Sequence, residues 1–308
     1  MEFNKEIKEK LDYLHTIGNN ISLDKFNDFQ RMQIEFGLDK GVDVSLYANP
    51  KFDPEQMSYI RLGLEKGLDA SIYAKPEFNR RQMREIWLGL LQQLDVSSYA
   101  KPEITERNMR HMRIQLNKEK TDNPMLKKYY NQDFNDEQIE QIELGICLYN
   151  VDVSSYAKPE YNAKQMNEIL EGLRLDIDVS AYAKPEFDAE QMSNIRRGIQ
   201  HKLDISIYAK PEFNAKQMDR IIWGLEKGLD VSIYAKPEFN RRQMTEIFLG
   251  LSDDLDVSIY TKPEFNHLQM EQIRHGLKLG LDVSIYAKPE YNAFEMIYLI
   301  KLLVKGGI

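Results

Sequence analysis

The stretch that decides the fold is FNAKQMDRIIWGLEKGLDVSIYAKPE, residues 213–238. Asn214 is suited to an N-cap, because its side chain can accept a hydrogen bond from a backbone amide that the first helical turn leaves unpaired. Large apolar residues then follow at intervals of three and four, on one stripe of a helix: Met218, Ile221, Leu225 and Leu229. Gly228 can adopt the left-handed conformation that ends many helices. The first half of the stretch therefore predicts one long α-helix.

The second half of the stretch predicts a shorter element. Asp230 is a second candidate N-cap, for a short helix or 3-10 turn over residues 231–235. Lys236 precedes Pro237, and a residue before proline is driven out of the α-helical region. One unit is therefore a long helix, a short helix or 3-10 turn, and an extended link.

This unit recurs along almost the whole chain. The tyrosine of SIYAKPEF and its close variants returns every 26 residues, first at Tyr47, Tyr73 and Tyr99 and again from Tyr156 to Tyr286. No segment shows enough period-two alternation for a strand. One unit cannot bury its apolar stripe alone, so neighbouring units must stack. We predict an all-α fold, a single solenoid of about ten 26-residue units that forms a curved superhelix.

The array has two irregularities. Tyr99 and Tyr156 are 57 residues apart, five more than two repeats, and the string GICLYNVDVS carries one extra residue. We expect a kink or hinge near residues 117–133 and no domain boundary there. The predicted organisation is an N-terminal cap at 1–25, regular repeats at 26–103, a degenerate repeat at 104–133, regular repeats at 134–290 and a half repeat at 291–308.

The layout FNxxQMxxI…GLxxGLDVSIYAKPE resembles the leucine-rich variant repeat, in which long α-helices alternate with short 3-10 helices in a superhelix. The motif QMxxIxxGLxxGLDVSxYAxPEF is also similar to tandem repeats in proteins of low-GC Gram-positive bacteria and their phages. The first resemblance implies the fold. The second implies only a mobile-element or host-interaction setting.

Composition narrows the possible functions. The net charge is −8, which disfavours a protein that grips phosphate backbones, although nucleic-acid binding stays open. The five histidines show no metal-ligand spacing, and Cys147 is the one cysteine. No phosphate-binding loop or GxGxxG is present, and no apolar run is long enough to span a membrane. We expect a cytoplasmic protein that is not an enzyme and has no metal or cofactor.

Several residues recur once per unit. The repeated Asp is explained by capping, and the repeated Tyr by packing between units with its hydroxyl in water. A glycine inside each long helix, such as Gly224, costs about 1 kcal/mol relative to alanine, so a backbone or the Tyr ring must approach it closely. The repeated Lys of the KPE string could follow a phosphate chain. Because a glutamate stands two residues later each time, a solvated edge of compensating charges is favoured.

The repeats disagree most beside the apolar stripe. At Ile222 and its equivalents we find arginines and aromatic residues, the types enriched in binding hot spots. We expect this flank to be exposed, and the candidate partner-binding residues on it are Arg61, Arg80, Trp87, Arg113, Arg196, Ile222, Arg241, Phe248 and Arg274. The alternative is that the flank only packs against the next unit, with arginine stems over apolar surface.

Three functions follow from these patterns. The leading hypothesis is a protein-binding scaffold or inhibitor, in the setting of a phage or mobile element that acts on a host or defence protein. The alternatives are nucleic-acid or nucleotide binding through the Lys/Arg ladder, and self-assembly through the apolar end IYLIKLLVKGGI. The sequence does not identify the partner or the oligomeric state.

Overall fold

The computed structural model describes residues 23–306, and the chain divides into two compact units, Met1–Leu148 and Tyr149–Ile308. The single solenoid that we expected is therefore divided at the second irregularity, the GICLYNVDVS string. The degenerate repeat 104–133 lies inside the first unit. Of the predicted N-terminal cap, only the short η1 (Leu23–Lys25) belongs to the described residues.

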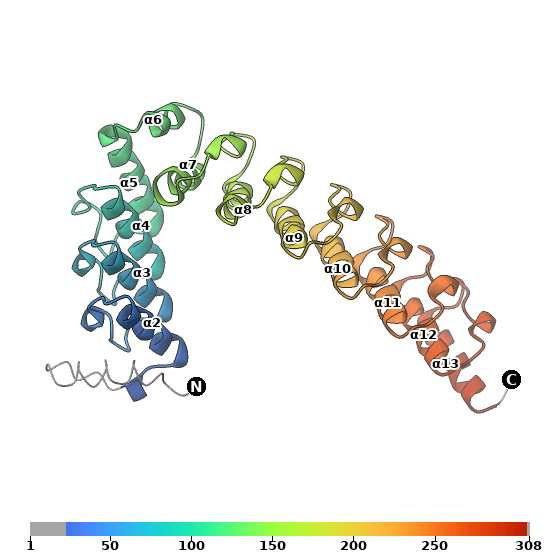
Figure 1. Ribbon diagram of the computed structural model, residues 1–308. Coiled ribbons are helices and arrows are strands. Elements are labelled where there is room, and N and C mark those ends of the chain that lie inside the picture. Colours follow the sequence, from blue (N-terminus) through green and yellow to red (C-terminus); the bar gives the residue numbers. More distant parts are fainter. Residues whose placement is uncertain (1–22, 307–308) are drawn as a thin grey trace. The chain divides into compact units, whose positions relative to one another are not determined.

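In the first unit, three regular repeats are followed by an irregular group of helices (Figure 1). Each helix stacks on the next, and α5 contacts both α6 and α7. The elements are α2 (Asp28–Asp39), η2 (Val44–Leu46), α3 (Pro54–Glu65), η3 (Ala70–Ile72), α4 (Arg80–Leu91), α5 (Glu106–Lys120), α6 (Pro124–Tyr130), α7 (Asp136–Glu143) and the π-helix η4 (Leu144–Tyr149).

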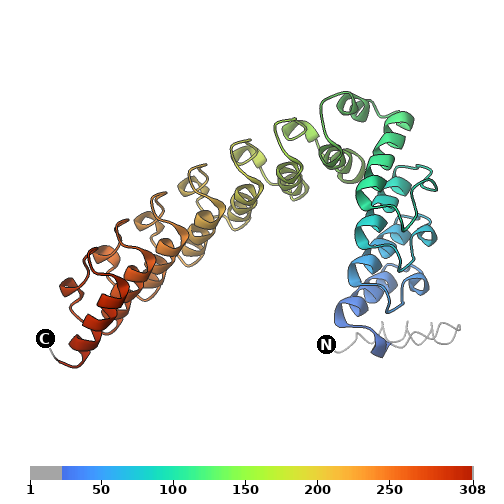
Figure 2. The same cartoon turned by 180° about the vertical axis from the view of Figure 1, so that it is seen from behind.

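The second unit is more regular, and its long helices line one side while the 3-10 turns and proline links line the other (Figures 1 and 2). Its long helices are α8 (Ala163–Arg174), α9 (Ala189–Gln200), α10 (Ala215–Glu226), α11 (Arg241–Ser252), α12 (His267–Lys278) and α13 (Ala293–Val304). The 3-10 helices are η5 (Val153–Ser155), η6 (Val179–Ala181), η7 (Ile205–Ile207), η8 (Val231–Ile233), η9 (Val257–Ile259) and η10 (Val283–Ile285). Residues 23–306 contain helices and no strand, which confirms the all-α fold.

The predicted helix signals are confirmed in the repeat that contains α10. The Asn214 side chain accepts hydrogen bonds from the amides of Lys216 and Gln217, both at 3.1 Å. Gly228 follows the helix with φ +69°, the left-handed conformation expected for a glycine stop. Asp230 caps η8 by accepting from the Ser232 amide at 3.1 Å.

A buried glutamine joins each regular repeat to the next. Gln217 Oε1 accepts from the Asn214 amide at 2.9 Å, which completes a capping box. Gln217 Nε2 donates to two carbonyls of the following link, Pro237 at 3.0 Å and Phe239 at 2.8 Å. One or both of these donated bonds recur at the equivalent glutamines, Gln30, Gln56, Gln82, Gln165, Gln191, Gln243 and Gln269.

The helix glycine makes room for the tyrosine of its own repeat, as expected. A Cβ on Gly224 would lie 2.0 Å from the Tyr234 hydroxyl oxygen. That hydroxyl donates to the Arg220 carbonyl, one turn before the glycine, at 3.3 Å. The tyrosine is fully buried, so the expectation that its hydroxyl reaches water is wrong. Its equivalents Tyr47, Tyr73, Tyr182 and Tyr260 make the same bond.

The irregular segment lacks both devices. In α5 the glutamine position is Asn108, which is exposed, and the glycine position is Gln115. The extra residue of GICLYNVDVS is absorbed by the π-helix η4, because a π-turn holds one more residue than an α-turn. Loss of the glycine therefore coincides with loss of the tyrosine that needs it.

Replacing Gly224 with alanine should destabilise the protein, although alanine is normally the better helix former. The added Cβ would also lie 2.6 Å from Val231 Cγ1. Overpacking of this kind costs about 1–3 kcal/mol, which urea unfolding would measure. Tyr234→Phe removes the clashing oxygen, so the double variant should recover part of the loss. Strictly additive losses would contradict this explanation of the glycine.

Replacing Gln217 with glutamate should lower the free energy of unfolding by about 1–3 kcal/mol at neutral pH. The carboxylate can still accept from Asn214 but has no proton for the carbonyls of Pro237 and Phe239. A protonated carboxyl can donate, so its pKa is raised by folding and the loss should shrink as pH falls through that pKa. Thermal unfolding from pH 7 to pH 4 would show this trend.

The matched control is Glu295→Gln, because Glu295 holds the same position in α13 and accepts from the Asn292 amide. Its stability should change little. Equal effects at the two sites would show that the amide matters only for the cap.

Candidate partner-binding surface

The predicted flank lies largely between neighbouring long helices. The exposed fraction is 0% for Ile222 and Arg113, 5% for Phe248 and 6% for Trp87. The expectation that this flank is exposed is therefore wrong for these four residues. Its physical reason is the stacking of long helices in one layer, which covers the shoulder of each helix with its neighbour.

The side chain at each Ile222 position meets the side chain that stands 28 residues earlier, on the preceding long helix. Charged pairs form in this way between Arg196 and Glu168 at 2.8 Å and between Arg274 and Glu246 at 2.9 Å. We call these contacts seam pairs. The others are Arg61 with Gln33 at 3.1 Å, Arg113 with Glu85 at 3.0 Å, Trp87 with Tyr59 at 6.2 Å between ring centroids, and Phe248 with Arg220 at 5.2 Å.

The seam pairs explain much of the variation between repeats without a ligand. A glutamate in one repeat accompanies an arginine in the next, and a tyrosine accompanies a tryptophan. The arginines of the predicted site at positions 61, 113, 196 and 274 are thus bound within the chain. Packing, the alternative that we left open, accounts for this part of the flank.

The most buried seam pair belongs to a polar cluster in the first unit. Arg113 Nε donates to Glu85 at 3.0 Å, and its guanidinium also pairs with Glu143. Burial opposes the charge on Arg113, but the two carboxylates outweigh it and raise the pKa of Arg113. Asn117 and Tyr130 donate to Glu143 as well, so the cluster ties α5 to α4, α6 and α7.

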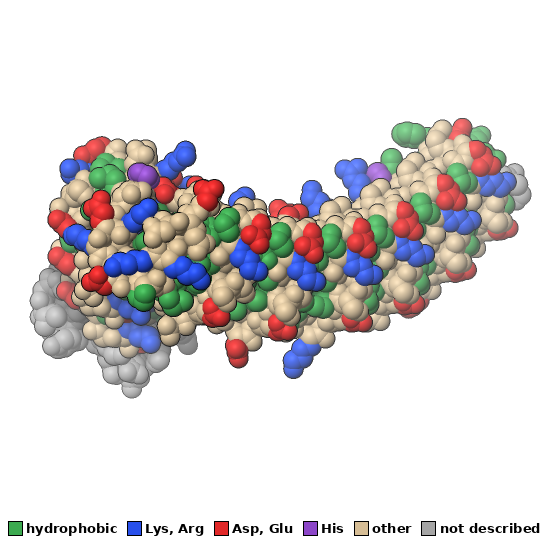
Figure 3. Space-filling model, turned by 90° about the horizontal axis from the view of Figure 1, so that it is seen from above, with side chains coloured by type: hydrophobic (Ala, Val, Ile, Leu, Met, Phe, Trp, Pro, Cys, Tyr) green, Lys and Arg blue, Asp and Glu red, His purple; other side chains and the backbone are tan. Residues whose placement is uncertain are grey.

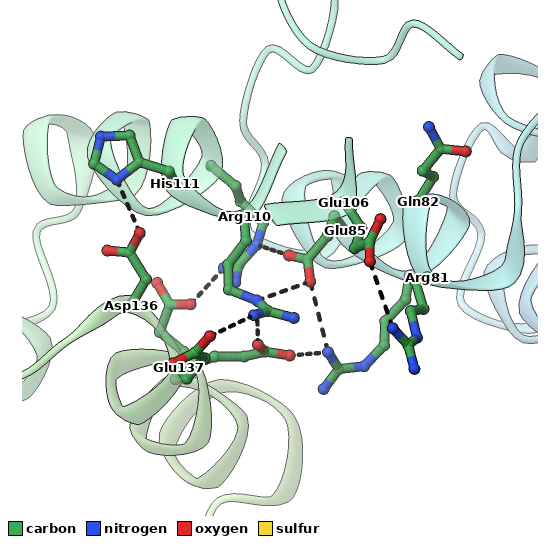
Figure 4. Close-up of polar contacts among 12 residues, drawn as sticks. Arg81, Gln82, Glu85, Glu106, Arg110, His111, Asp136 and Glu137 are labelled. Atoms are coloured by element: carbon green, nitrogen blue, oxygen red, sulfur yellow. Dashed lines mark hydrogen bonds and ion pairs between the residues drawn. The ribbon is translucent and has the colours of Figure 1, made fainter. Parts of the chain in front are cut away.

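A groove of about 460 Å³ lies beside this cluster (Figure 4). Four arginines line it with three glutamates, and most of these charges are neutralised within the cluster. Arg110 Nε, for example, lies 2.6 Å from Glu140 and 3.3 Å from Glu85. This groove is held together by ion pairs between helices, so we do not place the binding surface there.

Arg80 and Arg241 are the two predicted site residues that are exposed. Arg80 pairs with Glu55 of α3. Arg241 has no ion-pair partner within the described part of the chain. It lines a second groove of about 430 Å³, over α9, α10 and α11, together with Glu190, Asn194, Lys216 and Asp219.

Sequence reasoning missed Trp223, the residue next to Ile222 in α10. Trp223 is 46% exposed, and its ring lies 4.6 Å from the guanidinium carbon of Arg220. On an α-helix the next residue is rotated by about 100°, which carries Trp223 out of the seam that covers Ile222. The signal in the sequence was the difference in position between the chain's two tryptophans, Trp87 and Trp223.

The lysine ladder lies on the surface of both units. Its eight members are exposed, and none forms an ion pair with the glutamate two residues later within residues 23–306: Lys75, Lys101, Lys158, Lys184, Lys210, Lys236, Lys262 and Lys288. Figure 3 shows basic and acidic side chains spaced regularly along the second unit. The charges therefore compensate one another as rows and do not neutralise one another in pairs.

Other features of the described residues are soon reported. Residues 23–306 contain no group of three or more His, Cys, Asp or Glu side chains that could hold a metal ion, and no helix among them could span a membrane. Cys147 is exposed, but partial desolvation and then Glu143 raise the pKa of its thiol to about 11, so the reactive thiolate is scarce. In α13, Phe294 and Tyr298 are 84% and 63% exposed, and self-assembly through this end stays a prediction.

No family model, no curated protein and no solved structure matches this chain. The resemblances drawn from the repeat motif thus stay expectations.

Truncating Trp87 to alanine should lower the free energy of unfolding by about 3–5 kcal/mol, because a buried ring is removed from the contact with Tyr59. Trp223→Ala is the matched control and should change stability by much less. Chemical unfolding of both variants would measure the difference. Equal stability losses would place Trp223 in the core as well.

Proposed function

We propose that the protein is a non-enzymatic binding module, a scaffold or inhibitor, that holds a protein partner on the outer face of α10 and α11 in the second unit. The observation that carries this proposal is Trp223, a half-exposed tryptophan beside Arg220 and Arg241. Tryptophan and arginine are the residue types most enriched in binding hot spots.

The surroundings of Trp223 match the anatomy of such a surface. The ring supplies apolar area, and the groove beside it offers polar and charged side chains for a surrounding rim. The seam behind it, with Ile222 and Phe248 buried, fixes α10 against α11. A surface on a rigid pair of helices binds without paying to order a loop.

The biological setting rests on the resemblance of the repeat motif alone. A phage or mobile-element factor that blocks a host or defence protein would use a surface of this kind, and it would need no catalytic group. The absence of catalysis is part of the proposal.

Capture of a partner from the native host, followed by mass spectrometry, tests the proposal. Trp223→Ala should weaken binding of the captured protein by about 2 kcal/mol or more, about 30-fold, without loss of helicity. Thr245→Ala, a change on the partly exposed surface of α11, is the control and should bind normally. Recovery of no stoichiometric protein partner, or full binding by Trp223→Ala, would count against this surface.

Nucleic-acid binding is the second candidate, and the unpaired lysine ladder favours it. Basic side chains that contact phosphates give an affinity that falls steeply with salt. Gel shifts with DNA and RNA at low salt would reveal such binding. No shift at micromolar protein would remove this candidate, and a salt-sensitive shift lost on changing Lys210, Lys236 and Lys262 to glutamine would establish it.

A further inference from the structure

Arg220 differs from every other arginine in the seam. Arg61 pairs with Glu65, Arg113 with Glu85 and Glu143, Arg196 with Glu168, and Arg274 with Glu246. Arg220 has no carboxylate partner among the described residues, although it is only 6% exposed. Its seam partner, Phe248, is aromatic and cannot neutralise it.

The guanidinium of Arg220 is held by two rings. Its carbon lies 4.6 Å from the Trp223 ring centroid and 5.2 Å from that of Phe248. The nearest acid in the chain, Asp219, is already bound to Arg197 at 2.9 Å. Desolvation and then the charge of Arg241 lower the pKa of Arg220, so the two cations burden one another.

An unpaired buried cation is costly, because its lost hydration is not replaced. Arg220 Nε is buried and has no acceptor. The two terminal nitrogens donate to no described residue and are not buried, so they remain open to an acceptor from outside. The cation is thus held in place by the rings while its hydrogen-bonding edge is unused.

We propose that Arg220 and Arg241 form a carboxylate-binding site, which takes an aspartate or glutamate side chain of a protein partner, with the Trp223 ring as its apolar wall. The proposal deepens the proposed function and rests on it. A guanidinium offers two parallel N–H groups that match the two oxygens of a carboxylate. The incoming acid would supply the partner that Glu168 and Glu246 supply to the seam arginines of other repeats.

A protein carboxylate fits this place better than a nucleic acid. Glu190 and Asp219 line the groove beside Arg241, and a chain of phosphates would meet their negative charge. One acidic side chain can instead approach the two arginines while an apolar neighbour covers Trp223. The net charge of −8 also opposes a polyanion.

The first test needs no partner and compares two arginines of the same seam. Arg220→Met should leave the melting temperature unchanged or raise it, because the variant removes an unpaired charge and keeps an apolar stem. Arg274→Met should lower it, because Glu246 loses the partner that lies 2.9 Å away. An equal fall in both variants would show that Arg220 is already satisfied within the chain and would overturn the proposal.

The second test uses a blocked peptide of alternating glutamate and leucine, with the glutamine–leucine peptide and ten-residue oligothymidylate as comparisons. NMR of the arginine Nε–H groups should show a saturable shift of the Arg220 signal with the glutamate peptide only. Arg220→Gln should weaken binding of that peptide about ten-fold or more. No saturable shift, unchanged binding by Arg220→Gln, or tighter binding of the oligonucleotide would each overturn the proposal.

The captured partner separates this inference from the proposed function. If Trp223→Ala releases the partner and Arg220→Gln keeps it, the surface binds protein but not through a carboxylate. If both variants keep the partner, the surface itself is misplaced. Loss of the partner with both, and its retention by Arg220→Lys with reduced affinity, would support the carboxylate site.

Discussion

The carboxamide of one glutamine per repeat is the interaction on which the regular parts of this structure depend. Gln217 uses its oxygen to close the cap of its own helix and its nitrogen to hold two carbonyls of the next link. An amide does both because it carries an acceptor and two donors on one rigid group. The same side chain therefore fixes where a helix starts and where the following repeat lies.

The glycine and tyrosine form a second device that is present or absent as a whole. Regular repeats place the tyrosine hydroxyl where a Cβ would otherwise stand, as at Gly250 and Tyr260. In α5 and α13 the glycine position holds Gln115 and Leu302, and neither helix is followed by such a tyrosine in this sequence. Asn108 and Glu295 replace the glutamine in the same two helices. The repeats that have lost one device have thus lost both.

Variation between repeats has two physical origins in this protein. Much of it is compensated inside the seam, where an arginine in one repeat answers a glutamate in the preceding one. Compensated variation has no need of a ligand. Arg220 stands apart because its charge is answered by aromatic rings alone. An uncompensated charge at a position that is otherwise paired indicates function more strongly than variability does.

The sequence by itself determined the elements. Asn214 and Asp230 begin helices through local bonds to their own backbone, and Gly224 signals a close approach because glycine is costly in a helix. These signals are local, so the 26-residue period and the all-α fold follow from them. The π-helix at η4 could be anticipated only as an extra residue, because the choice between a bulge and a loop depends on the surrounding packing.

Tertiary structure alone decided which side of each long helix meets its neighbour. Ile222 and Trp223 are adjacent in sequence, yet one is fully buried and the other half exposed. The apolar stripe does not distinguish its two shoulders, because a helical wheel does not contain the crossing of the next helix. The candidate surface therefore lies one residue beyond the flank that the sequence suggested, since burial on that flank is set by a contact 28 residues away along the chain.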